Sequence, residues 1–144
     1  MIKQVGNKIY RRFDKELLCI EPWGKNSFRI RATQRHEFIP DDISALLEPV
    51  PCEIKVYERG TDTVIENGKI ICEITRTGKL RFLNQNGKLL LEEYERIRGM
   101  SEEGRKEFNS ALEIFPRTFE PHPSVDNFKL TVRFEPVDGE KIYG

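Results

Sequence analysis

The feature that most constrains the fold of this chain is a period of two in its hydrophobic residues. SFRIRAT (27–33) alternates apolar with polar side chains, and in KIICEIT (69–75) the apolar residues Ile70, Cys72 and Ile74 share one face. FKLTVRF also alternates, and its apolar set is Phe128, Leu130, Val132 and Phe134. Successive side chains of a strand point to opposite faces, so the pattern is typical of antiparallel strands with one buried and one solvated face.

Glycine-containing turn signals separate these strands at short intervals. Asn67-Gly68, Thr77-Gly78 and Asn86-Gly87 divide residues 63–94 into four short runs. Asn-Gly favours two-residue type I′ turns, because it supplies two positive φ angles. The spacing therefore predicts three successive hairpins, a β-meander, over residues 63–94. Further strands are expected near residues 8–13, 17–22, 27–34, 52–58, 111–119 and 127–135.

Three segments interrupt the strand pattern. Residues 40–49 are compatible with one helical turn, capped by Asp41 or Asp42. Residues 98–108 read as a charged loop, and the proline-containing residues 116–127 as a connection or an edge strand. Many short strands with regular turns predict an all-β fold, an antiparallel β-sandwich with at most short helical turns. A closed barrel is the alternative.

Charge and cysteine content bear on partners and location. Among 144 residues, 24 are Lys or Arg and 24 are Asp or Glu. Nucleic acid and anionic membranes are bound through excess positive charge, so neither is an expected partner. The chain shows no signal-peptide pattern and no apolar run near the roughly 20 residues of a membrane span. Cys19, Cys52 and Cys72 fit neither a disulfide framework nor a zinc site, which predicts a cytoplasmic setting. We expect Cys52 and Cys72 to be small core residues of strands.

The sequence contains no evident catalytic, cofactor or metal site. His36 and His122 lack further ligands at metal-binding spacing and are expected at the surface. No glycine-rich phosphate loop or nucleophile elbow is present, so no cofactor is expected. Glycoside cleavage needs two acids facing each other across a cleft, whereas neighbours in a strand point apart. The adjacent acids that we read as solvated charge are Asp41/Asp42, Glu92/Glu93 and Glu102/Glu103.

Trp23 is the one weak candidate for carbohydrate binding. It is the only tryptophan and lies in the loop-like segment IEPWGKN. A loop tryptophan can stack on a sugar ring, with Tyr57 or Tyr94 as companions, or it can cap the end of a sandwich core. Outward-facing arginines are expected to pair with acids across strands, and these are Arg29, Arg31, Arg81 and Arg133.

Three segments, in order, resemble the N-terminal region of glycoside hydrolase family 31, which includes α-glucosidases and α-xylosidases. They are WGKNSFRIRAT, ENGKIICEITRTGKLRFLNQNGKLLLEE and FKLTVRFEPVDGEKIYG, and the likeness covers roughly residues 17–144. The first is closer to the bacterial α-xylosidase-like branch. The last is the most specific, and its matching residues are Phe134, Glu135, Asp138, Glu140, Lys141, Tyr143 and Gly144.

The resemblance implies that residues 1–144 form a single N-terminal β-sandwich domain of the galactose-mutarotase type. The family's catalytic module is a (β/α) barrel that follows, with an aspartate nucleophile and an aspartate acid/base for retaining hydrolysis. Both aspartates are expected beyond Gly144, so no catalytic residue is carried over to this chain. The expected function is that of a non-catalytic domain that packs on the barrel and helps to shape its sugar-binding cleft.

Two other hypotheses stay open at this point. One is a free-standing sugar-binding sandwich with Trp23 as its platform, and the other is a scaffold that pairs only with proteins. If further strands normally complete the sheets, unpaired edges predict dimerisation through an edge strand, or disorder near residues 98–108. The expected partners are thus a carbohydrate substrate of the parent enzyme, the parent's own barrel and a second copy of the chain.

Overall fold

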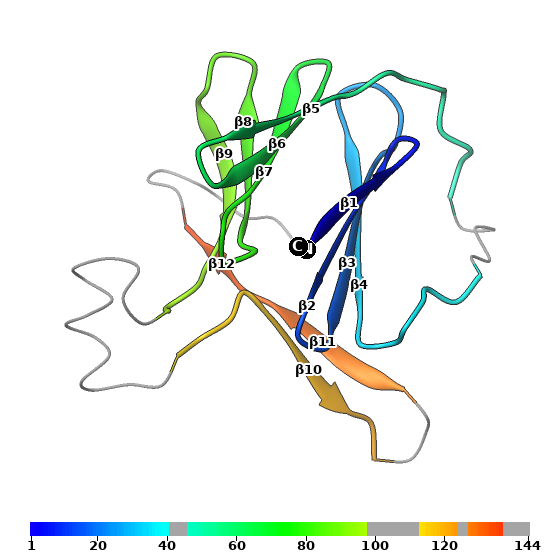
Figure 1. The fold of residues 1–144 in the computed structure, drawn as a ribbon, viewed down its shortest axis with the longest axis vertical. Coiled ribbons are helices and arrows are strands. Elements are labelled where there is room, and N and C mark those ends of the chain that lie inside the picture. The colour runs from blue at the N-terminus through cyan, green and yellow to red at the C-terminus, as the bar shows by residue number, and fades with distance from the viewer. Residues whose placement is uncertain (41–45, 98–112, 124–126, 137–144) are drawn as a thin grey trace.

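The computed structural model describes residues 1–40, 46–97, 113–123 and 127–136. All the secondary structure in these residues is β-strand, arranged in a four-stranded sheet, a six-stranded sheet and a two-stranded ribbon. Figure 1 shows the two larger sheets facing each other, with the ribbon across one end. The predicted all-β, antiparallel sandwich is confirmed. The predicted loop at 98–108 and the helical turn proposed after Asp41 and Asp42 fall on residues outside these ranges.

The four-stranded sheet is built by consecutive antiparallel strands in the order β1-β2-β3-β4. Their bounds are Ile2–Val5 (β1), Lys8–Phe13 (β2), Glu16–Pro22 (β3) and Phe28–Thr33 (β4). Strand β1 was not expected from the sequence, because all four of its residues are exposed and show no buried face.

The six-stranded sheet contains the predicted meander and adds one strand at each edge, in the order β12-β9-β8-β7-β6-β5. The meander strands are Asp62–Asn67 (β6), Ile70–Ile74 (β7), Leu80–Asn84 (β8) and Leu89–Glu93 (β9). The edges are Lys55–Arg59 (β5) and the two residues Phe134–Glu135 (β12).

The hairpins are as predicted, but their turn type is not. Asn67 is the last residue of β6 and pairs with Ile70, so the first turn is centred on Gly68 and Lys69. Only Gly68 has a positive φ, 62°, as in a type II′ turn. In the third hairpin Gly87, at φ 82°, follows a turn closed by its N–H to the Asn84 carbonyl. The predicted type I′ turns are therefore wrong, because a type I′ turn needs two positive φ angles and each Asn-Gly pair supplies one.

The ribbon pairs Arg117–Pro121 (β10) with Phe128–Val132 (β11). The prediction of an edge strand in the proline-containing segment is thus confirmed. The strand expected near 111–119 begins only at Arg117, and ahead of it Ile114 makes an isolated bridge to Arg96. Two backbone hydrogen bonds link the ribbon to the six-stranded sheet. The Tyr94 N–H donates to the Arg133 carbonyl, and the Arg133 N–H donates to the Pro116 carbonyl.

The hydrophobic core lies between the two large sheets. The four-stranded sheet contributes Ile9, Leu18 and Ile20, and the six-stranded sheet contributes Ile65, Cys72, Ile74 and Leu80, all at most 1% exposed. Each large side chain buried in this way stabilises the fold by roughly 1.5–3 kcal/mol. Because both inner faces obey the period of two, the apolar alternation in the sequence directly builds this core.

The cysteines only partly follow the prediction. Cys72 is fully buried in the core, and burial raises the pKa of its thiol well above the ordinary value. Cys52 is half-buried and precedes β5 rather than lying in it, and its thiol donates to the Gly24 carbonyl. The prediction of a core strand position for Cys52 is wrong, because strand β5 begins three residues later. Within the described residues, no helix is long and apolar enough to cross a membrane.

Candidate functional site

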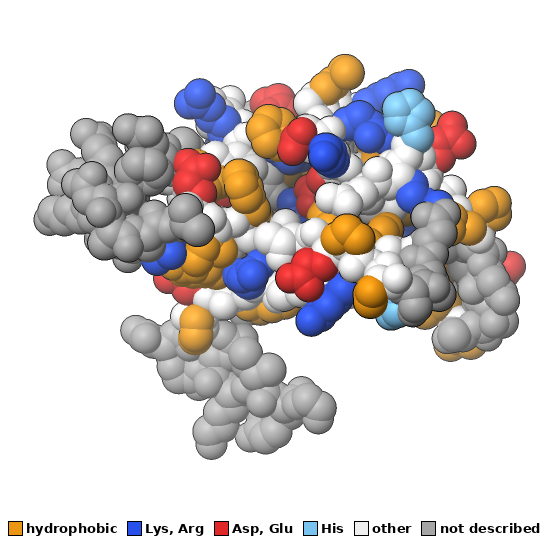
Figure 2. Space-filling model, turned by 90° about the horizontal axis from the view of Figure 1, so that it is seen from below, with side chains coloured by type: hydrophobic (Ala, Val, Ile, Leu, Met, Phe, Trp, Pro, Cys, Tyr) orange, Lys and Arg blue, Asp and Glu red, His pale blue; other side chains and the backbone are white. Residues whose placement is uncertain are grey.

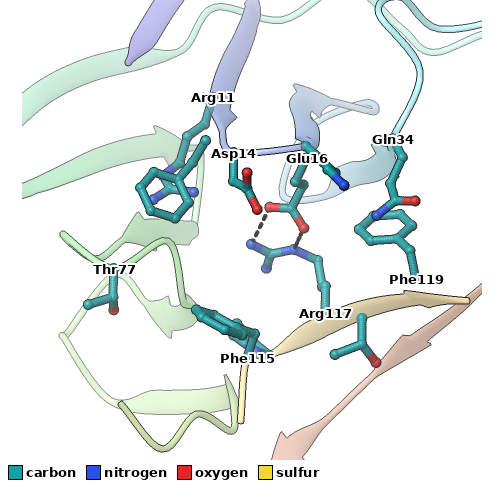
Figure 3. Close-up of a pocket in the computed structure, with 12 residues that line it drawn as sticks. Arg11, Asp14, Glu16, Gln34, Thr77, Phe115, Arg117 and Phe119 are labelled. Carbon is teal, nitrogen blue, oxygen red and sulfur yellow. Dashed lines mark hydrogen bonds and ion pairs between the residues drawn. The ribbon is translucent and has the colours of Figure 1, made fainter. Parts of the chain in front are cut away.

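A pocket of about 240 Å³ opens at one end of the sandwich, where the ribbon meets the four-stranded sheet. Its lining residues come from the end of β2, the turn into β3, the end of β4, the β7–β8 loop and the start of β10. Figure 3 shows Glu16 and Arg117 facing each other within it. The lining residues that Figure 3 labels are Arg11, Asp14, Glu16, Gln34, Thr77, Phe115, Arg117 and Phe119.

Arg117 joins three parts of the fold behind this pocket. Its Nε and Nη2 atoms donate to the two carboxylate oxygens of Glu16 at 2.9 and 3.0 Å, a bidentate pair. Its Nη1 atom donates to Oε2 of Glu93 on β9, and Nη2 also donates to the Gly78 carbonyl at 2.8 Å. The Arg117 side chain is 4% exposed. Because these contacts connect β10, β3 and β9, Arg117 holds the ribbon onto both sheets.

Glu93 is the most buried acid of this cluster. Its Oε2 atom also accepts the backbone N–H of Leu80 at 2.8 Å, and the residue is 3% exposed. Burial raises the pKa of Glu93 above its ordinary value of 4.5, while the contact with Arg117 opposes the shift. The native state therefore binds this proton more readily than the unfolded chain does.

We expect stability to fall with rising pH on account of Glu93. A raised native pKa contributes stability that is fully present below pH 4.5 and is lost as the pH rises through the native pKa. Urea unfolding of the wild type and of Glu93→Gln at pH 4 and pH 7 measures this contribution. The free energy of unfolding of the wild type minus that of the variant should be lower at pH 7 than at pH 4. A difference that increases with pH would show that the Arg117 contact outweighs burial.

The remaining buried acids are likewise held in ion pairs. Glu21 lies beside Arg29 and Arg31, at 3.6 and 3.1 Å, and beside Lys8. Glu73 is fully buried between Arg59 and Arg81, and Arg81 also contacts Glu92 at 3.3 Å. The prediction that outward-facing arginines pair across strands is confirmed for Arg29, Arg31 and Arg81. Arg133 instead donates to the hydroxyl of Thr118.

The site residues considered from the sequence remain apart from this pocket. His36 and His122 are exposed, as predicted, and the described residues contain no group of three or more His, Cys, Asp or Glu that could hold a metal ion. Trp23 is half-buried in the turn after β3, with the Arg29 guanidinium 4.9 Å from its ring centroid. A sugar would have to stack on the opposite face of the ring.

Side-chain amides help to hold the turn that carries Trp23, in addition to its backbone bond from Trp23 N–H to the Ser27 carbonyl. Asn67 is 1% exposed, and its amide donates to the carbonyls of Gly24 and Ser27, both at 2.8 Å. Asn26, at φ 65°, accepts the backbone N–H of Lys69 at 2.6 Å. Asn67 thus ends strand β6 at the predicted hairpin and also holds the loop next to Trp23.

Comparison with known proteins shows what the chain is similar to. No family model matches it. It is 42% identical over 144 residues to an uncharacterized family 31 glucosidase of Pseudescherichia vulneris, covering 96% of this chain and 27% of that protein. Among solved structures, a GH31 α-xylosidase from a soil metagenome, crystallised with xylose, is 38% identical with a TM-score of 0.82. That match covers 96% of this chain and 21% of the other.

A second solved structure agrees in fold. The GH31 α-xylosidase of Xanthomonas citri is 19% identical with a TM-score of 0.62, covering 94% of this chain and 14% of the other. At this identity the likeness shows the fold alone. The chain spans only about a quarter of the length of the first relative. The predicted resemblance to glycoside hydrolase family 31 is thereby confirmed, and the chain corresponds to a β-sandwich segment, consistent with the N-terminal domain, of longer proteins in that family.

Proposed function

We propose that this chain serves as the non-catalytic N-terminal domain of a retaining α-glycosidase that hydrolyses α-glucosidic or α-xylosidic bonds. The observation that carries the proposal is the similarity to a family 31 glucosidase and a GH31 α-xylosidase over 96% of this chain, although it spans only 27% and 21% of them. In this proposal the hydrolytic acids belong to another part of the longer protein.

The electrostatics of the described residues support a non-catalytic role. Retaining hydrolysis needs two carboxyl groups about 5–5.5 Å apart, with a cleft between them. The buried acids Glu21, Glu73 and Glu93, and the half-buried Glu16, instead each contact arginine. A carboxylate bound in this way is a poor nucleophile, because its charge is already neutralised.

Exposed apolar residues near the ribbon support packing against a further domain. Leu130, Val132 and Phe134 follow the period of two and are 38%, 37% and 46% exposed, and Phe115 is 44% exposed. Figure 2 shows that hydrophobic side chains on the face seen from below are interspersed with acidic and basic ones. Mixed surfaces of this kind are typical of interfaces between domains. We propose the catalytic barrel as the occupant, and the sugar-contact role of Trp23 and the cytoplasmic location remain predictions.

The proposal is tested by assaying the purified 144-residue chain on aryl α-glucoside and aryl α-xyloside. We expect no turnover above the uncatalysed rate, because the described acids offer no nucleophile and acid pair. A folded relative with family 31 activity serves as the positive control in the same buffers. Clear turnover by the 144-residue chain, with retention of anomeric configuration, would contradict the assignment of catalysis to another part of the protein.

A further inference from the structure

Arg11 is a buried cation without a hydrogen-bonding partner in the described part of the chain. It lies on β2, facing the sandwich interior like Ile9, and is 7% exposed. Its guanidinium stacks on the Phe13 ring at 5.0 Å from the centroid, but within the described residues it makes no hydrogen bond and no ion pair. None of its nitrogens is a fully buried atom without a partner, so the guanidinium reaches the pocket that it lines, where an anionic group could pair with it.

The backbone next to Arg11 is shaped to leave room for the guanidinium. A Cβ atom at Gly78, where φ is 93°, would lie 2.4 Å from Nη1 of Arg11. The carbonyl of Gly78 is bound by Arg117. Burial is the main reason that the pKa of Arg11 lies below its ordinary value; the Glu16 and Glu95 carboxylates oppose the shift, and the Arg117 cation adds to it. The pKa still lies below its ordinary value, so a further anion beside Arg11 would stabilise its charge.

Two of the cations that line the pocket, Arg11 and Lys15, make no direct contact with an acid in the described part of the chain. Arg11, Lys15 and Arg117 are the cations, and Asp14 and Glu16 are the acids. Glu16 is occupied by its bidentate contact with Arg117, which Glu93 balances further. Counting Glu93, three acids balance the three cations, so it is the absence of a direct partner at Arg11, and not a net positive charge, that favours a ligand carboxylate there.

The side chains that line the pocket indicate the size and polarity of the ligand beyond its carboxylate. Phe13, Phe115 and Phe119 contribute aromatic surface, and Gln34 and Thr118 contribute polar groups. A pocket of about 240 Å³ is smaller than a drug-sized site and matches a body of one ring or one side chain. From the buried unpaired guanidinium and the aromatic walls, we propose that this pocket binds an organic monocarboxylate on a small apolar body, with Arg11 as the residue that pairs with the carboxylate.

The proposal does not depend on the assignment to a glycosidase, and it is tested on the 144-residue chain by NMR titration of the arginine Nε–Hε signals. Sodium benzoate is the main probe, benzamide its neutral analogue, and acetate the carboxylate without an apolar body. N-acetylglutamate N-methylamide distinguishes an acidic protein side chain from a free acid as the source of the carboxylate. For a ligand of this size we expect saturable binding with a Kd on the order of 1 mM.

Benzoate should shift the Arg11 signal, and benzamide should bind at least about tenfold more weakly because it lacks the charge. Tighter binding of the glutamate derivative than of benzoate identifies a protein side chain as the ligand, and the reverse order identifies a free acid. Benzoate and benzamide binding equally, or no saturable shift with any carboxylate, would overturn the proposal.

Three variants test the location of the site: Arg11→Met and Asp14→Asn change it, and Arg12→Met is the control. Arg11→Met should weaken benzoate binding at least about tenfold. Arg12→Met should leave it unchanged, because Arg12 is the next residue of the strand and donates instead to the His36 carbonyl. Asp14→Asn, which tolerates the positive φ of 52° at this turn, should tighten binding by removing the competing acid. Equal binding by Arg11→Met and the wild type, or weaker binding by Asp14→Asn, would contradict the role of Arg11.

Discussion

Replacing Arg117 by methionine is expected to lower the free energy of unfolding by about 3–5 kcal/mol. The substitution keeps the aliphatic part of the side chain but removes four hydrogen bonds, to Glu16 twice, to Glu93 and to the Gly78 carbonyl. Glu93 would remain as a nearly fully buried acid without its cation. Urea unfolding followed by circular dichroism measures the loss, provided that the m-value is unchanged.

Arg133→Met is the matched control for this prediction. Arg133 is half-buried near the same ribbon, and within the described residues its side chain makes one hydrogen bond, of 3.0 Å from Nη1 to the Thr118 hydroxyl. We expect the loss of this hydrogen bond to lower the free energy of unfolding by only about 0.5–1.5 kcal/mol. The double variant Arg117→Met/Glu93→Gln should recover part of the stability, because a neutral amide still accepts the Leu80 N–H. Equal costs for Arg117→Met and Arg133→Met would contradict the proposal that Arg117 holds the ribbon to the sandwich.

Truncating Leu18 to alanine is expected to destabilise the fold by about 2–5 kcal/mol. Leu18 is fully buried on β3, within the cluster that fills the space between the two sheets. The substitution leaves a cavity that neighbours on both sheets would have to fill, and close-packed cores relax only partly. The same urea experiment measures the effect.

Leu47→Ala removes the same atoms at the surface and provides the comparison. Leu47 is 89% exposed in the segment between β4 and β5, so the change should stay within about 0.5 kcal/mol. A cost for Leu18→Ala as small as that for Leu47→Ala would mean that the two large sheets do not pack through this cluster.

Most of the fold could be predicted because it depends on local pattern. The alternation in SFRIRAT and KIICEIT identified strands β4 and β7 and the side chains that line the core, including Ile30 and Ile74. Glycines at turn positions predicted the hairpins of the meander. Strand β1 escaped prediction because it pairs along one edge without burying a face.

The Arg117 cluster could not be predicted because its contacts are long-range. Arg117 and Glu16 are 101 residues apart in the chain, and nothing in the sequence around either indicates the other. Arg117 lies in a proline-containing segment that reads as a connection or an edge strand. The interpretation of Glu93 as solvated charge is wrong, because Glu93 is 3% exposed and binds Arg117. The contacts of Asn67 could not be predicted for the same reason. Its local pattern is that of a turn, but its amide donates to carbonyls that are 40 and 43 residues away in the chain.

The measurement that tests the account most directly is a domain exchange. The segment of the soil-metagenome α-xylosidase that matches this chain is replaced by this chain, which is 38% identical to it with a TM-score of 0.82. We predict that the folded chimera hydrolyses aryl α-xyloside, whereas the 144-residue chain alone does not. A folded chimera without activity, or activity in the isolated chain, would contradict the role of a non-catalytic domain of a family 31 glycosidase.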